Sequence, residues 1–198
     1  MKPSPPIESA RSVAQAFSLV ELLMVIAIIG ILAVITVPAM SALMQSSDLT
    51  RGGQLVTDQV NLGRQTASAQ NKVIELRFIQ VPGRRGYAAA QLWRSDDNGD
   101  MTPSRRIVIL PQSVTIADNS LSPGIAKLPA ASMSLNGSNV TYRALQIRPS
   151  GEITPIAAMA DLAFAVVPEV FAANSSLPAN YFLVQINPVT GVPLAYRP

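Results

Sequence analysis

The chain has neither cysteine nor histidine among its 198 residues. Without cysteine it forms no disulfide framework and no thiolate metal site. Without histidine it lacks imidazole acid–base chemistry, the Ser-His-Asp triad and the commonest zinc ligands. Its glycines are scattered and form no phosphate-binding loop. The sequence therefore predicts a protein that is not an enzyme and that carries no cofactor.

Charged and aromatic residues are also scarce, at 14% and 5% of the chain, whereas 48% of the residues are hydrophobic. The formal net charge of +3 is too small a bias to indicate a nucleic-acid partner. Beyond a long N-terminal helical region, roughly 130 residues remain, which is enough for one domain with a modest core.

One apolar run stands out near the N-terminus. Between positions 17 and 37, the residues that are not apolar are Ser18, Glu21, Gly30 and Thr36. At about 1.5 Å per residue this segment spans roughly 30 Å, the thickness of a hydrocarbon core. The run is apolar on all sides, whereas a soluble helix shows a polar face. The pattern predicts a transmembrane helix over residues 17–37.

Glu21 places a lone carboxylate near the start of this run. A charge inside a membrane segment costs at least a few kcal/mol and usually has a partner. Cleavage before Phe17 would create an amine four residues away, about one helical turn, on the same face. The alternative is a carboxylate that reaches back to the lipid headgroups.

The residues around this position form a recognisable motif, and they read Ala16-Phe17-Ser18-Leu19-Val20-Glu21-Leu22-Leu23. The run resembles the class III signal of type IV pilins and type II secretion pseudopilins, with Ala16 where that family usually has Gly. The resemblance implies that residues 1–16 are a leader peptide, that a prepilin peptidase cuts between Ala16 and Phe17, and that Phe17 is then N-methylated.

In this family the carboxylate at the position of Glu21 pairs with the terminal ammonium of a neighbouring subunit. Gly30 and Pro38 also fall where family members have a helix-softening Gly and Pro. The implied partners are other pilins or pseudopilins, the prepilin peptidase, an inner-membrane assembly platform and membrane lipid. With Lys2 and Arg11 in the leader, the positive-inside tendency places the N-terminus in the cytoplasm and the head in the periplasm.

After Pro38 the apolar residues recur at three- and four-residue steps, which predicts an amphipathic stem helix over residues 38–71. Its stripe consists of Leu49, Gly53, Val56, Val60, Gly63 and Ala67. From position 72 the period changes to two, which is typical of half-buried strands. Strands are predicted at residues 73–79, 86–94, 107–116 with an interruption at Pro111, 141–147, 163–167, 181–186 and 193–196.

This order predicts an α+β fold, in which a long N-terminal helix packs on an antiparallel sheet that forms a β-rich head over residues 72–198. The head resembles the H-type minor pseudopilin and the FimT-like pilins. The likeness is carried by the strand and turn of residues 142–152 and by the closing turn of residues 187–191. The chain is also similar to members of bacterial pilin-like cassettes.

Two clusters in the head are weak candidates for ligand sites. Oxygen ligands for calcium could come from Asp96, Asp97, Asn98 and Asp100, but the spacing fails the EF-hand pattern. The sequence favours a solvated turn there. Basic residues for DNA phosphates could come from Arg84, Arg85, Arg105 and Arg106. Acidic neighbours and sparse aromatics favour an ordinary exposed surface instead.

The sequence thus predicts a minor pilin or pseudopilin that assembles through its N-terminal helix into a type II secretion pseudopilus or a type IV pilus. Two alternatives stay open. One is a tip pilin that binds DNA during uptake, and the other is a signal-anchored periplasmic protein that does not polymerise.

Overall fold

The computed structural model describes residues 17–156 and 158–198. The predicted leader, with Ala16 at its end, lies outside the described residues. The chain divides into two compact units, Met1–Ser41 and Ala42–Pro198. Helix α1, Leu19–Gln70, contributes to both units and continues through position 38, although the side chains at 35–39, 41 and 42 lie outside the description.

In the described part of the chain, no helix is both long enough and apolar enough to cross a membrane. The membrane span over residues 17–37 stays a prediction from the sequence.

The first sheet of the second unit is antiparallel and has the strand order β3-β2-β1-β7-β6. Short strands β4 and β8 extend it by pairing with β2 and β7. The bounds are β1 Ile74–Ile79, β2 Ala89–Ser95, β3 Met101–Pro103, β4 Val108–Ile109, β6 Ala130–Leu135, β7 Ser138–Ile147 and β8 Ile153–Thr154.

The second sheet is also antiparallel, in the order β11-β10-β9-β5. Its strands are β5 Val114–Ile116, β9 Ala163–Pro168, β10 Phe182–Ile186 and β11 Pro193–Tyr196. Short helical elements lie between strands, namely α2 Pro123–Lys127 and the 3-10 turns η1 Met159–Asp161 and η2 Glu169–Phe171. The helix followed by antiparallel sheets confirms the predicted α+β class.

The prediction of a single interrupted strand over residues 107–116 was wrong. Strand β4 pairs with β2 in the first sheet, whereas β5 pairs with β9 in the second. Pro111 lies between them, and it provides no N–H for a continuous ladder. The sheets meet where the backbones of Tyr87 and Ile116 exchange two hydrogen bonds of 2.9 Å.

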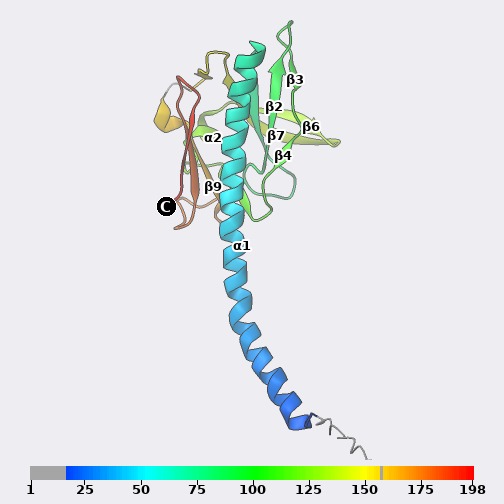
Figure 1. The fold of residues 1–198 in the computed structure, drawn as a ribbon. Helices are drawn as coiled ribbons and strands as arrows, with labels where there is room; N and C mark the ends of the chain where they lie inside the picture. Colours follow the sequence, from blue (N-terminus) through cyan, green and yellow to red (C-terminus); the bar gives the residue numbers. More distant parts are fainter. Residues whose placement is uncertain (1–16, 157) are drawn as a thin grey trace, which may run out of the picture. The chain divides into compact units, whose positions relative to one another are not determined.

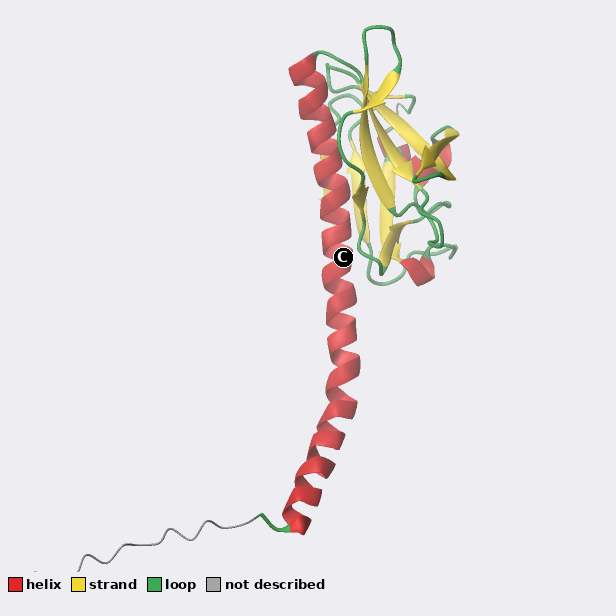
Figure 2. Ribbon diagram, turned by 90° about the vertical axis from the view of Figure 1, so that its right-hand side faces the viewer, coloured by secondary structure: helices red, strands yellow, loops and turns green. Residues whose placement is uncertain are grey.

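The C-terminal part of α1 runs along the strands (Figures 1 and 2), and its apolar side chains belong to the main hydrophobic core. The predicted apolar stripe is confirmed, since all six of its positions are buried. Leu49, Val56, Val60 and Ala67 belong to one cluster that includes side chains of both sheets. The helix is therefore the shared core element of the two sheets.

Glycines allow this close packing. A Cβ on Gly53 would lie 2.1 Å from the ring of Phe182 in β10, and one on Gly63 would lie 2.7 Å from Ile147 in β7. The missing side chains let the helix backbone approach one sheet at each of these two levels.

Candidate functional site

Ser18 of the predicted signal accepts two backbone hydrogen bonds at the start of α1. The N–H of Glu21 donates to the hydroxyl of Ser18 over 3.4 Å, and the N–H of Leu22 donates to the Ser18 carbonyl. Ser18 therefore occupies the N-cap position, and the acidic residue three positions later has the sequence spacing of a capping box. A carboxylate in the first turn also interacts favourably with the helix dipole.

The side chains described around this cap are exposed and apolar. Phe17 is 73% exposed, and the large apolar residues along the first unit are exposed as well. They are Leu19, Val20, Leu22, Leu23, Met24, Val25, Ile26, Ile28, Ile29, Ile31, Leu32 and Val34. Such a contiguous apolar surface marks a site of association with lipid or protein.

Glu21 is exposed on this apolar surface, with its carboxylate four residues from Phe17. A Cβ added to Gly30 would meet no heavy atom within 4 Å. Packing inside the subunit therefore does not require glycine at that position. The roles assigned to Phe17, Glu21, Gly30 and Pro38 stay predictions.

The acidic loop between β2 and β3 is a closed turn. One carboxylate oxygen of Asp96 accepts the N–H groups of Asn98 and Asp100, over 2.9 and 2.8 Å. Asp97 forms an ion pair with Lys72, which holds the pKa of the Asp97 carboxyl below its usual range. Among the described residues, no group of three or more His, Cys, Asp or Glu side chains is arranged to hold a metal ion.

Of the four candidate DNA-binding arginines, Arg84 is engaged inside the head. Its guanidinium donates to the backbone carbonyls of Leu110, Pro111, Gln112 and Val114. It also lies 3.4 Å from the carboxylate of Glu169. This side chain thus links the loop before β5 to η2. Arg105 and Arg106 are exposed.

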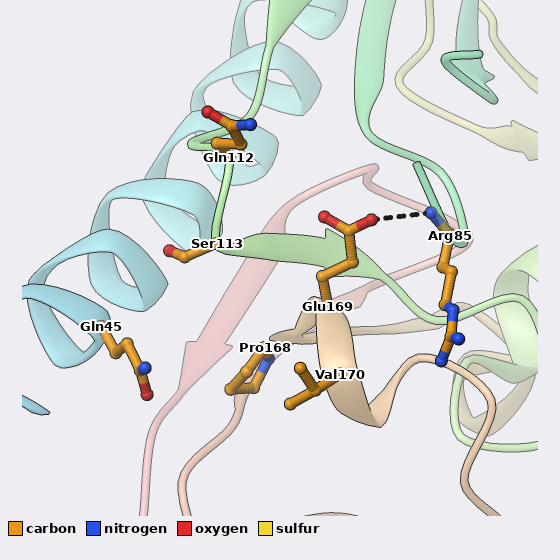
Figure 3. A pocket seen from close by; sticks show the side chains of 7 residues that line it. All are labelled: Gln45, Arg85, Gln112, Ser113, Pro168, Glu169 and Val170. Atoms are coloured by element: carbon orange, nitrogen blue, oxygen red, sulfur yellow. Dashed lines mark hydrogen bonds between the residues drawn. The ribbon is translucent and has the colours of Figure 1, made fainter. Parts of the chain in front are cut away.

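Arg85, the fourth of these arginines, borders an open cavity of about 420 Å³ (Figure 3). Its backbone N–H donates to Glu169 over 2.9 Å, and Ser113 donates to Asp48 over 2.6 Å. Gln45, Gln112, Pro168 and Val170 complete the lining. The carboxylates of Glu169 and Asp48 thus already accept hydrogen bonds, whereas the exposed guanidinium of Arg85 forms no ion pair within the described residues.

Residues 11–37 match the family model of the prokaryotic N-terminal methylation motif. The chain carries this methylation motif. The match covers the predicted cleavage position and the lone carboxylate, and it confirms the prediction of a type IV pilin-type signal. No curated protein matches the chain in sequence.

Two solved structures of the minor pseudopilin EpsH from the type II secretion system of Vibrio cholerae resemble the fold. One is 11% identical, covers 76% of this chain and 96% of its own, and has a TM-score of 0.45. The other is 12% identical with a TM-score of 0.47, and it covers 77% of this chain and 96% of its own.

Three features of the structure were not predicted. The capping role of Ser18 was available from the spacing Ser18-Leu19-Val20-Glu21. The carbonyl groups that accept hydrogen bonds from Arg84 come from a loop more than 25 residues away, so no local sequence pattern predicts them. The third feature is the cavity beside Arg64. It is lined by three separate segments of the chain, so the local sequence around Arg64 does not predict it.

Proposed function

We propose that the chain is a minor pilin or pseudopilin subunit of a type II secretion pseudopilus or a type IV pilus. Residues 17–37 anchor it in the inner membrane before assembly, and the mature chain begins at a methylated Phe17. The observation that carries the proposal is the methylation motif over a segment whose apolar side chains are exposed in the single subunit.

Assembly would bury this exposed segment, first in lipid and then among the helices of neighbouring subunits. Burying apolar surface contributes about 25 cal/mol per Å². Apolar contact is non-directional, so it distinguishes neighbouring registers less sharply than a paired charge does. The proposed register comes from the carboxylate of Glu21 and the terminal amine of an adjacent copy.

A desolvated ion pair of this kind adds little net stability, but its loss is costly because one charge remains buried without a partner. The pair would select one axial position of a new subunit. Capping by Ser18 supports this role, because it keeps the first turn helical and holds the carboxylate on the face of the amine.

The test replaces Glu21 with Gln in the native organism and measures both processing and assembly. Mass spectrometry of the native protein is expected to show a chain that begins at Phe17 and is heavier by one methyl group. The variant is expected to be cut at the same bond, and its co-purification with other pilins is expected to fall at least tenfold. A loss of about 3 kcal/mol corresponds to a larger factor still.

The matched control is Glu152→Gln, which removes an exposed carboxylate of the head. It should leave co-purification unchanged. An intact Met1 on the native protein would contradict processing, and normal assembly of the processed Glu21→Gln variant would contradict the role of the ion pair.

A further inference from the structure

A second cavity, of about 540 Å³, lies beside the C-terminal part of α1. Three segments line it. Helix α1 contributes Arg64 and Ser68, the turn after β7 contributes Ser150 and Gly151, and the turn between β10 and β11 contributes Thr190. The volume falls in the range of small-ligand pockets.

Arg64 brings an uncompensated positive charge to this cavity. Within the described residues, no carboxylate forms an ion pair with it. Its Nε is buried without a hydrogen-bond partner, and its Nη1 has one long contact of 3.4 Å to Asn61. A buried donor that lacks a partner costs free energy, so this guanidinium is not satisfied by its own chain.

The aliphatic part of the Arg64 side chain lies against Gly191. A Cβ on Gly191 would lie 2.9 Å from Cδ of Arg64 and 2.5 Å from the carbonyl oxygen of Gly151. Gly191 also has a φ of 65°, in the left-handed region that glycine adopts without strain. The two turns therefore lie close to each other and to the aliphatic part of the arginine side chain.

Two hydroxyl groups of the cavity accept hydrogen bonds but donate none to the described residues. Ser150 and Thr190 accept the N–H groups of Glu152 and Val192, and neither hydroxyl donates to another described residue. Each hydroxyl still has one proton to donate. Together with the guanidinium, the lining offers hydrogen-bond donors and one net positive charge.

From this donor set we propose that the cavity is a carboxylate-binding site. A planar guanidinium matches the two oxygens of a carboxylate, and a single positive charge balances a single negative one. The hydroxyls of Ser150 and Thr190 would donate to the same group. This proposal does not depend on the proposed assembly function, because it concerns the head alone.

The test titrates the full-length chain in detergent with acetate and with N-acetylglutamate amide, and follows the Arg64 Nε–H resonance by NMR. Sodium chloride at equal ionic strength is the blank. We expect a saturable shift with both carboxylates. Tighter binding of the glutamate amide would assign the site to an acidic side chain, and equal binding would assign it to small carboxylates.

Arg64→Lys keeps the charge without the planar fork and is expected to weaken binding on the order of tenfold or more, followed through the Gly151 and Thr190 amides. Arg51→Lys is the matched control on the same helix, where the arginine is exposed, and it should bind as the wild type does. Absence of saturation, equal affinity of Arg64→Lys, or tighter binding of inorganic phosphate would overturn the proposal.

Discussion

Gly53 and Gly30 lie on the same helix, yet their surroundings are opposite. Three ring atoms of Phe182 lie within 2.5 Å of a Cβ built on Gly53, whereas a Cβ on Gly30 meets nothing within 4 Å. An aromatic ring cannot yield as the end of a flexible side chain does. Gly53 is therefore required by the packing of the head, and Gly30 is not.

We predict that Gly53→Ala lowers the free energy of unfolding of the head by about 1–3 kcal/mol, the usual cost of overpacking. Denaturant titration, monitored by the fluorescence of the single tryptophan, Trp93, measures it. Gly30→Ala is the matched control and should leave this transition in place. Equal transitions for the two variants would contradict the close approach of α1 to β10.

The ion pair between Lys72 and Asp97 makes the stability of the head depend on pH. The hydrogen bond from Lys72 lowers the pKa of Asp97, so the carboxylate binds protons less readily in the folded than in the unfolded state. Its contribution to stability is therefore present above the ordinary carboxyl pKa of about 3.9 and is lost as the pH falls through the lowered value. Lys72→Met should raise the Asp97 pKa to its usual range in a carboxyl NMR titration. An unchanged titration would show that the pair does not form in solution.

At the scale of single residues, the sequence predicts the roles of only some of the candidate site residues. The run from Ala16 to Glu21 could be recognised because its chemistry is local, with a small residue, an aromatic and an acid at fixed spacing. The internal role of Arg84 could not, because its carbonyl partners are brought to it by the tertiary fold.

Strand β1 carries an ion pair on the face opposite α1. Arg77 pairs with Glu75, and its guanidinium lies 3.7 Å from the ring centroid of Trp93 and 4.3 Å from that of Tyr142. The strands on either side, β2 and β7, supply these rings. Both charged residues are less than 10% exposed. The stack thus joins three adjacent strands on their outer face.

We predict that Arg77→Met destabilises the head by about 3–5 kcal/mol, because Glu75 stays buried without its partner. Combining it with Glu75→Met should recover most of that loss, since an apolar pair of similar volume requires no desolvation of charge. Unfolding free energies of the single and double variants form the cycle that measures this. Additive losses would contradict the coupling.

At the scale of elements, the residue pattern located strands with one buried face, such as β10, and also strands buried on both faces, such as β1 and β9. It found β1, β9, β10 and β11 to within two residues. It missed β6, in which alternation is limited to Ser132–Leu135 and no side chain is fully buried. The turn Asn136-Gly137 between β6 and β7 is a strong hairpin signal that the predicted strand at 141–147 did not use.

For the whole molecule, the sequence predicts a helix and a sheet but not that the strands divide between two sheets. That division depends on which distant strands pair, as β5 does with β9 across about fifty residues, and a local pattern carries no such information. The sheets are also joined by the N–H of Ile153, which donates to the carbonyl of Pro188 over 2.7 Å. The Arg64 cavity lies at this junction, so it too arises only from the assembled fold.

The glycine contacts of α1 have a mechanical consequence. Because the buried face of the helix packs on side chains of both sheets, tension along its axis is transmitted to the hydrophobic interior of the head. Separating the stem from the sheets would expose this hydrophobic interior to water. We therefore expect a load that detaches the stem to unfold the head as well.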